Sequence, residues 1–444
     1  MQVSVETTST IERRMTIGVP ASKVDSEVEK RLQKTAQTVR MNGFRPGKVP
    51  LSVVRRRYGD GVRQEVVGEV MRDAYIDALQ QEKLNPAGYP KFEPKQLDSG
   101  KDLEFTAIFE VYPEIQVGDL SSLTLTQEAA EVVDADIDNM IEMLRKQSQT
   151  WAETEEPAAE GDRLTVDYKG TLGGEAFEGG TADGASIQIG SKRMIPGFEE
   201  GLVGLKAGES KTLDLTFPED YHAENLKGKA TQFEVSVKKV EAAKLPEVNE
   251  EFFAQYGVQE GGMEAFRAEL KKNMEREAKF AIANKVKQQI VDQLIASNEM
   301  QVPGALIQSE IQKMKQDAVQ RFGGGQMDPA QLPDELFKDQ SEKRVKTGLL
   351  FAQIIKDQEL KASDEEIEAK IRELAASYQE PEQVVSWYMG NAEQKAQIES
   401  VVLEDTVVEY VLGKAKVTTK NVSYDDAVKP AAAAAADAEE SSDE

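Results

Sequence analysis

The hydrophobic periodicity of this chain changes along its length, and this change constrains the fold more than any other feature. Residues 1–20 and 103–111 alternate apolar and polar side chains with the period of two that β-strands show. The segments with helical spacing between them are 22–41, 51–58 and 60–83. Residues 150–243 are rich in glycine and β-forming side chains, whereas helical periodicity dominates beyond Pro246. The pattern predicts a multidomain α+β protein.

Length and composition exclude several classes of function. At 444 residues the chain is too long for a single core, so we expect two to four domains. It has no cysteine and one histidine, His222, which excludes disulfides and thiolate zinc sites and argues against histidine metal sites and serine triads. No lysine-containing phosphate-binding motif occurs. We expect no cofactor and no metal, and we place His222 in a loop without a catalytic role.

The sequence shows neither a membrane span nor a secretory signal. It has no run of about 18 apolar residues, and its first twelve residues are polar and alternating. We therefore expect a soluble, cytoplasmic protein that has no membrane partner.

Charge is divided unevenly along the chain. The whole sequence has 54 basic and 80 acidic residues, a formal net charge of -26. Residues 1–112 hold 18 Lys and Arg against 16 Asp and Glu, so the remainder carries the negative excess. Between Arg40 and Arg72, eight basic residues stand against three acidic ones. A positive region on an acidic chain is typical of a surface that binds phosphates or acidic protein.

Residues 43–50 read Gly-Phe-Arg-Pro-Gly-Lys-Val-Pro and lie between two helical segments. The glycines allow unusual backbone angles and the prolines restrict theirs, so the turn is expected to hold Phe44, Arg45 and Lys48 outward. The basic triplet Arg55-Arg56-Arg57 follows. A solvated turn between helices is the alternative interpretation.

This octet resembles the ribosome-docking signature Gly-Phe-Arg-x-Gly-Lys-x-Pro of bacterial trigger factors, and the resemblance extends along nearly the whole chain. It implies that Phe44, Arg45 and Lys48 contact a protein of the large ribosomal subunit and adjacent RNA at the exit of the polypeptide tunnel. Pro46 stands where many relatives have lysine, which leaves Lys48 or the arginine triplet to compensate. The resemblance also implies nascent and unfolded polypeptides as clients, and a homodimer when the protein is off the ribosome.

Four ordered blocks within residues 150–243 resemble an FKBP-type prolyl isomerase. The blocks are Val166-Asp167-Tyr168-Lys169-Gly170, Phe177-Glu178-Gly179-Gly180, Met194-Ile195-Pro196-Gly197-Phe198-Glu199-Glu200-Gly201 and Phe217-Pro218-Glu219-Asp220-Tyr221. The resemblance implies an apolar pocket for the substrate prolyl ring, lined by Tyr168, Phe177, Ile187, Ile195, Phe198, Tyr221 and Phe233. Phe198 would form its floor, where that family usually has tryptophan, and Glu178 would orient Tyr168.

The implied chemistry needs no nucleophile, because isomerisation of an X-Pro bond breaks no covalent bond. The resemblance suggests that the backbone N–H of Ile195 and the hydroxyl of Tyr221 hold substrate carbonyl groups while the amide rotates. Aromatic residues on alternating strands also occur in ordinary hydrophobic cores, and a core without a pocket is the alternative for any one of them.

Changes in periodicity and composition divide the chain into five parts, to which the resemblance adds roles. These are a ribosome-binding α+β domain (1–112), a connector (113–149), an FKBP-like β-sheet and helix domain (150–245), an all-helical chaperone domain (246–420) and a disordered acidic tail (421–444). Residues 323–325, three glycines, form a hinge or a loop. The methionines that would suit promiscuous client contact are Met263, Met274, Met314, Met327 and Met389. Two other functions are considered: an FKBP-type isomerase or an ATP-independent holdase acting off the ribosome.

Overall fold

The structure is a computed structural model that describes residues 1–42, 44–45, 47–221, 223–322, 327–375, 378 and 380–430. The predictions for Gly43, Pro46, His222, residues 323–325 and residues 431–444 therefore lie outside the described residues, as does the side chain of Glu178. The chain forms two compact units, residues 1–127 with 284–420 and residues 128–283 with 421–444.

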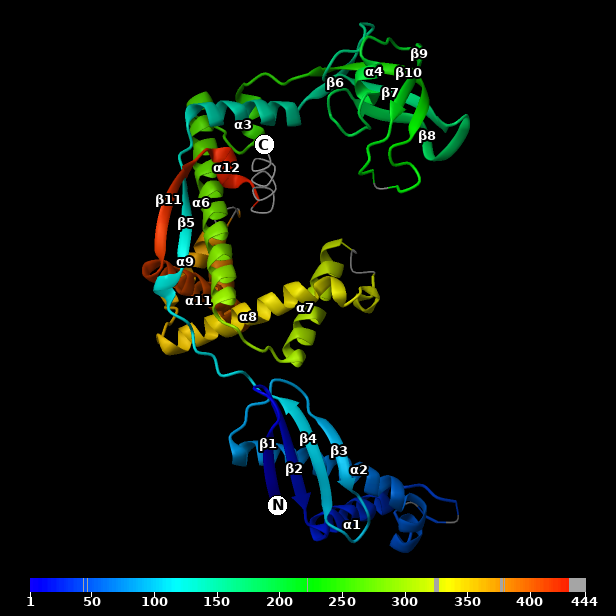
Figure 1. The fold of residues 1–444 in the computed structure, drawn as a ribbon, viewed down its shortest axis with the longest axis vertical. Coiled ribbons are helices and arrows are strands. Elements are labelled where there is room, and N and C mark those ends of the chain that lie inside the picture. The colour runs from blue at the N-terminus through cyan, green and yellow to red at the C-terminus, as the bar shows by residue number, and fades with distance from the viewer. Residues whose placement is uncertain are drawn as a thin grey trace. The chain divides into compact units, whose positions relative to one another are not determined.

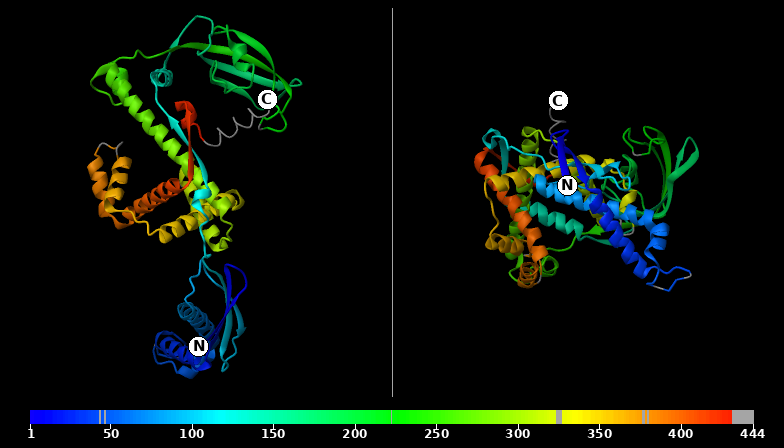
Figure 2. Two further views of the ribbon diagram at one scale, coloured as in Figure 1. Left: turned by 60° about the vertical axis from the view of Figure 1, so that its left-hand side comes forward. Right: turned by 90° about the horizontal axis from the view of Figure 1, so that it is seen from below.

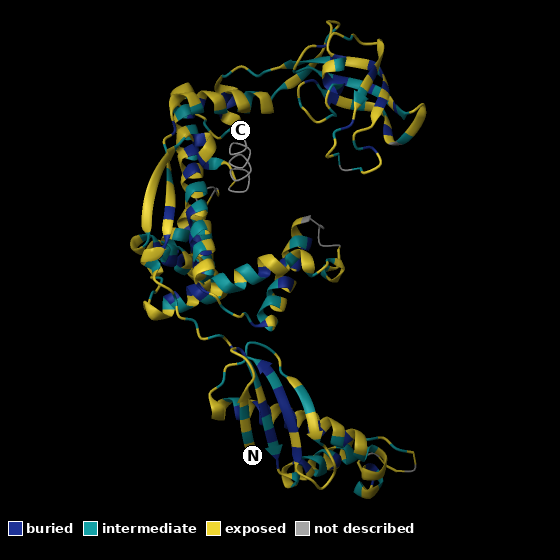
Figure 3. Cartoon of the chain, in the orientation of Figure 1, coloured by how far each residue is buried: buried dark blue, intermediate teal, exposed yellow. Residues whose placement is uncertain are grey.

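The N-terminal part of the first unit is an antiparallel sheet packed on two helices. Its elements are β1 (Gln2–Thr7), β2 (Glu12–Val19), α1 (Ala21–Thr38), α2 (Leu51–Glu82), β3 (Lys91–Gln96) and β4 (Leu103–Glu110), with strand order β1-β2-β4-β3. Buried residues concentrate on the central strands β2 and β4 (Figure 3). Phe105 and Phe109 of β4 share a core with Val66 and Val70 of α2, and α1 and α2 lie side by side (Figure 2).

Two details of this domain differ from the sequence prediction. The segments 51–58 and 60–83 are one continuous helix, α2, with Gly59 and Gly61 inside it. Each glycine costs a helix interior about 1 kcal/mol, and burial of neighbours such as Val54 and Val62 offsets that cost. The alternation of apolar and polar residues does not predict β3, because the lysines and Pro94 of this strand interrupt that alternation.

The β-rich region of the second unit is a five-stranded antiparallel sheet with one short helix. Its elements are β6 (Thr150–Glu153), β7 (Arg163–Leu172), β8 (Glu175–Gln188), α4 (Phe198–Leu202), β9 (Ser210–Thr216) and β10 (Ala230–Lys244) (Figure 1). The strand order is β6-β10-β7-β8, and β9 also pairs with β10. The region 150–243, which the sequence shows to be rich in β-forming side chains, forms this sheet. Bulges interrupt the pairing of β7 with β8 on either side of Tyr168 and Lys169.

The rest of the second unit is helical and includes the last described segment of the chain. Its helices are α3 (Asp134–Gln147), α5 (Glu250–Gln255), the first part of α6 (Gly262–Ser297) and α12 (Tyr424–Val428). Ile137, Phe252, Phe266 and Tyr424 share one core.

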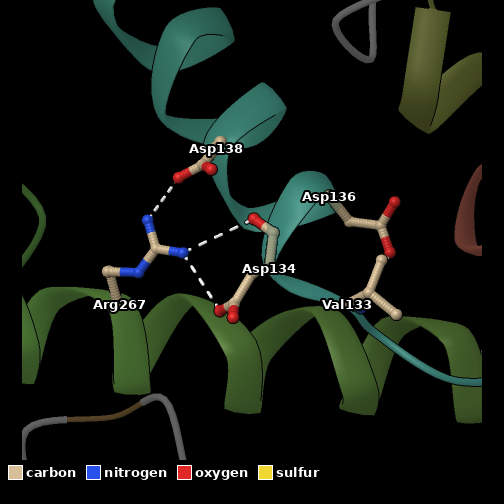
Figure 4. A network of polar contacts seen from close by, with 5 residues as sticks. All are labelled: Val133, Asp134, Asp136, Asp138 and Arg267. Atoms are coloured by element: carbon tan, nitrogen blue, oxygen red, sulfur yellow. Dashed lines mark hydrogen bonds and ion pairs between the residues drawn. The ribbon is translucent and has the colours of Figure 1, made fainter.

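A polar network joins the beginning of α3 to α6 (Figure 4). Arg267 of α6 donates to Asp138 and, at 3.1 Å, to the carboxylate of Asp134. The side chain of Asp136 accepts from the backbone N–H of Val133 at 2.9 Å, as an N-terminal capping carboxylate does. Hydrogen bonds to Asp138 and then Asp134 raise the pKa of Arg267.

The helices of the first unit surround a separate core. The elements are η1 (Leu120–Ser122), β5 (Thr124–Ala130), α7 (Gly304–Phe322), η2 (Pro329–Gln331), α8 (Glu335–Asp357), α9 (Asp364–Ala375), α10 (Pro381–Gly390), α11 (Ala392–Lys414) and β11 (Lys416–Val422). Ile290 of α6, Leu350 of α8 and Val407 of α11 meet in this core. Pro381 is the first residue of α10, where its missing N–H costs nothing.

Residues 113–149 contribute to two cores. Leu123 and Leu125 pack with the helices of the first unit, and Ile137 and Ile141 pack in the second. This segment is therefore more than a connector, because its apolar side chains are buried in the cores of both units.

The prediction of disorder from residue 421 is wrong for residues 421–428. These residues complete β11 and form α12, where Tyr424 is 4% exposed and Ala427 is fully buried. The hydroxyl of Tyr424 donates to Glu277 at 2.8 Å. Burial raises the pKa of Tyr424, and the Glu277 carboxylate raises it further.

Only part of the predicted methionine set is accessible to solvent. Met263 and Met327 are exposed, and Met389 is half-buried. Met274 and Met314 are buried and belong to the packing of their helices, so the expectation that they contact clients is wrong.

Candidate active site and docking loop

Four aromatic rings meet in the β-rich module, one from each of three strands and one from the short helix. Tyr168 lies on β7, Phe177 on β8, Phe233 on β10 and Phe198 at the start of α4. The ring centroid of Phe198 lies 5.7 Å from that of Tyr168 and 5.3 Å from that of Phe233, both edge to face. Phe177 approaches Phe233 at 6.0 Å. Aromatic pairs are favourable in this arrangement, so each ring helps to hold the others in position.

Two glycines allow these rings to lie against the strand backbones. Gly170 is the partner of Phe233 across β7 and β10. A Cβ at Gly170 would lie 2.7 Å from a ring carbon of Phe233 and 2.8 Å from ring carbons of Phe177. At Gly180 it would lie 2.7 Å from the ring of Phe177. Both positions therefore need the close approach that only glycine permits.

The predicted pocket residues divide into a buried floor and an accessible rim. Phe198 is 0% exposed, and Ile187 and Phe233 are each 5% exposed. The half-buried members packed against them are Tyr168, Phe177, Ile195 and Tyr221. The structure thus brings together all seven predicted lining residues, three of them buried and four half-buried against the same core.

Phe217 also belongs to the cluster, although no role was predicted for it. Its ring lies 5.8 Å from that of Phe177 and 4.7 Å from that of Tyr221, and its side chain is 4% exposed. It joins the Tyr221 loop to the strands. The available signal was its place at the head of the fourth sequence block.

Glu199, directly after Phe198, holds the loop that carries Ile195. Its carboxylate accepts from the Ser191 hydroxyl at 3.0 Å and from the backbone N–H groups of Lys192, Arg193 and Met194 at 3.0, 2.9 and 3.1 Å. Burial by itself raises the pKa of Glu199, but these hydrogen bonds favour the charged form and bring the pKa below its ordinary value. Sequence reasoning missed this residue.

The next N–H along this loop is free. Among the described residues, the backbone N–H of Ile195 has no hydrogen-bond partner, whereas its carbonyl accepts from Phe198 at 3.1 Å. A rigid loop with a free donor at its end can bind a carbonyl oxygen without rearrangement.

Asp167 makes a second set of contacts near the cluster. Its carboxylate forms an ion pair with Lys238 at 2.6 Å and accepts from the backbone N–H of Gly184 at 2.7 Å. The hydrogen bond from Lys238 and then that from Gly184 lower the pKa of Asp167. These contacts tie β7, which carries Tyr168, to both neighbouring strands. The predicted contact between Glu178 and Tyr168 lies outside the described side chains.

The loop between α1 and α2 presents its predicted contact residues to solvent. Phe44 is 39% exposed, and Arg45 and Lys48 are exposed. The N–H of Lys48 donates to the carbonyl of Arg45 at 2.9 Å, and Gly47 has a φ of 75°. In the described part of the chain, the side chains of Arg45 and Lys48 form neither a hydrogen bond nor an ion pair.

The described residues contain neither a membrane-spanning helix nor a metal-binding cluster. No helix there combines the length and apolar character needed to cross a membrane. No group of three or more His, Cys, Asp or Glu side chains there could hold a metal ion.

Family models and relatives account for nearly the whole chain. A model described as bacterial trigger factor protein matches residues 1–144, one for the C-terminus of that protein matches 262–413, and one for FKBP-type peptidyl-prolyl cis-trans isomerase matches 154–238. A trigger factor of Hahella chejuensis is 71% identical over 440 residues, 99% of each chain. The chain belongs to the trigger factor family. A trigger factor of Marinobacter nauticus is 56% identical over 429 residues, 97% of this chain and 99% of that protein.

A solved structure described as "Promiscuous Substrate Recognition in Folding and Assembly Activities of the Trigger Factor Chaperone" is also similar. It covers 93% of this chain and 99% of its own, with 19% identity and a TM-score of 0.46. As a member of the trigger factor family, the chain is a ribosome-associated chaperone with an FKBP-type prolyl isomerase module. The family, fold class and activity predicted from the sequence are confirmed.

Proposed function

We propose that this trigger factor docks beside the tunnel exit of the large ribosomal subunit through Phe44, Arg45 and Lys48, and isomerises prolyl bonds at the Phe198 cluster. The division of labour follows the predicted domains, with docking in 1–112, isomerisation in 150–245 and client holding in 246–420. The observation that carries the catalytic part is the buried aromatic floor beneath a half-buried rim. The function uses no nucleotide, and we place it in the cytoplasm.

In the proposed mechanism the site favours the twisted amide over the planar one. The planar X-Pro amide is stabilised by charge separation, and rotation faces a barrier of about 18 to 20 kcal/mol. An apolar aromatic surface stabilises the charge-separated planar form less than water does, which lowers the relative cost of rotation. The rings of Tyr168 and Phe177 would contact the prolyl ring. The free N–H of Ile195 would donate a hydrogen bond to a substrate carbonyl while the amide rotates.

A hydroxyl deletion on the rim tests the proposed site without removing a ring. Tyr221→Phe removes one donor from a half-buried side chain, so kcat/KM for a prolyl peptide should fall by about tenfold, the equivalent of one hydrogen bond. Tyr89→Phe is the matched control, because Tyr89 is fully exposed in another domain. Equal kcat/KM for the two variants and the parent would refute the assigned role of Tyr221.

Docking is tested by cosedimentation with 70S ribosomes. The triple change Phe44→Ala, Arg45→Ala and Lys48→Ala should abolish binding and leave peptide isomerisation intact, because these exposed side chains lie in a domain separate from the aromatic cluster. Retention of full binding by this variant would refute docking through these residues, and absence of binding by the parent would favour the alternative of an isomerase or holdase acting off the ribosome. Sedimentation equilibrium of the free protein tests the proposed homodimer.

A further inference from the structure

The cations of α1 and α2 fall into two groups, those that pair with carboxylates and those that do not. Arg31 pairs with Glu69, and Arg55 pairs with Glu29. Arg63 pairs with Asp25 at 3.3 Å in the same way. These pairs connect the two helices. Each of these cations lies against a carboxylate, so a structural role explains its charge.

Arg56 and Arg57 behave differently. Both are exposed, and within the described residues neither makes a hydrogen bond or an ion pair. Asp60 follows them at the spacing of one helical turn but forms no ion pair with either. Two adjacent guanidinium groups therefore face solvent in the second turn of α2, the helix that begins three residues after Lys48.

The stability of α2 does not explain these charges. Its first turn contains no acidic residue, and its N-cap, Pro50, provides no side-chain hydrogen bond. Neighbouring like charges on α2 repel one another. A local charge arrangement that opposes folding and has no compensating contact is a sign of function.

We propose that Arg56 and Arg57 bind backbone phosphates of ribosomal RNA beside the docking loop. The inference rests on the proposed docking function and adds a second contact of a different kind. Guanidinium groups match phosphate oxygens in geometry and remain charged at all physiological pH values. A polyanion is the complementary partner, because the two arginines stand in a region where basic residues outnumber acidic ones.

The salt dependence of ribosome binding separates this contact from the loop contact. Each lost phosphate contact lowers the slope of log K against log salt concentration by about 1. The double variant Arg56→Gln, Arg57→Gln should therefore lower the slope by about 2 and weaken binding. Arg56→Lys with Arg57→Lys should retain the slope. Lys271→Gln with Lys272→Gln removes the same charge from α6 and should bind as the parent does.

Phe44→Ala serves as the comparison for the docking function itself. It should weaken binding at every salt concentration without changing the slope, because an aromatic contact releases no counterions. An unchanged slope in the double glutamine variant, together with weak binding by Phe44→Ala, would overturn the phosphate contact and leave docking intact. Full binding by Phe44→Ala would instead count against docking through the loop.

Crosslinking distinguishes RNA from an acidic ribosomal protein as the partner. The chain has no cysteine, so Ser52→Cys introduces one thiol for a photoreactive maleimide. Ser52 is exposed and lies four residues before Arg56, on the same helix face. We expect an adduct with ribosomal RNA that ribonuclease removes. An adduct with ribosomal protein alone would overturn the proposal, and the parent chain, which lacks a thiol, gives the background.

Discussion

The isomerase module and the tip of the N-terminal domain place their functional residues in opposite environments. Phe198 and Phe233 are buried and make edge-to-face contacts with each other and with Tyr168. Arg45 and Lys48 are exposed and have no side-chain partner among the described residues. Catalysis by an apolar surface requires packed rings, so the proposed catalytic residues also stabilise their fold. Recognition by charge requires unpaired cations, so the proposed docking residues contribute little to stability.

The largest effect is expected at the floor of the aromatic cluster. Phe198→Ala should destabilise the module by about 3 to 5 kcal/mol, because it removes a fully buried ring and leaves a cavity. Isomerase activity should be lost with it. Trp151 lies on β6 of this module, so its fluorescence in a Trp387→Phe background reports unfolding. Phe280→Ala, which truncates a ring that is 68% exposed on α6, is the control. A stable, inactive Phe198→Ala protein would break the link between packing and catalysis.

A smaller effect is expected where a ring lies on a glycine. Gly170→Ala places a methyl group within 2.8 Å of the Phe177 and Phe233 rings, and such overpacking costs about 1 to 3 kcal/mol. The displaced rings should also lower kcat/KM. Gly68→Ala in α2 meets no atom within 4 Å and should stabilise its domain by about 0.5 to 1 kcal/mol. Equal responses at the two glycines would show that the rings are free to move.

Glu199 links stability to pH. Its pKa is lower in the folded protein than the ordinary value of 4.5, so its stabilising contribution is present above that value and is lost as pH falls through the folded pKa. Glu199→Gln should cost about 1 to 2 kcal/mol at pH 7 and raise KM if the Ile195 loop loosens. The difference from the parent should shrink as pH falls from 4.5 through the folded pKa. Glu234→Gln, at an exposed position on β10, is the matched control.

The smallest effect on stability is expected at the docking tip. Phe44→Ala should change the free energy of unfolding of its domain by less than about 0.5 kcal/mol, although it weakens ribosome binding. Hydrogen exchange of β4 amides measures this stability. Phe105 is a fully buried ring of β4. Phe105→Ala should therefore increase the exchange rates of the same amides strongly. A large loss of protection in Phe44→Ala would mean that the tip stabilises the fold after all.

Periodicity in the sequence was sufficient to predict most of the secondary structure. The alternation of residues 1–20 and 103–111 corresponds to β1, β2 and β4, and the spacing of Ile282, Val286, Ile290 and Leu294 falls within α6. These patterns are readable because each strand or helix buries one face. The continuity of α2 was not predictable in this way, because Gly59 and Gly61 interrupt the local signal and packing restores the helix.

Contacts between segments that are distant in the sequence were harder to predict. The segment 421–428 is polar and short, and its order depends on Tyr424 reaching a core built by Phe252 and Phe266. Glu199 stood within a recognised block, but its role depends on the loop from Ser191 to Met194 turning back toward it. A hydrogen bond of this kind leaves no periodic trace in the sequence.

The sequence by itself determined the family, the order of the domains, the positions of the aromatic blocks and the exposed character of Phe44, Arg45 and Lys48. Local propensity and motif spacing are enough for these, because they depend on residues that are close together in the chain. Only the tertiary structure decided which rings form the floor and which the rim, which arginines are paired, and where the last helix packs. Burial and ion pairing depend on neighbours brought together by folding, and one sequence does not specify these pairwise contacts locally.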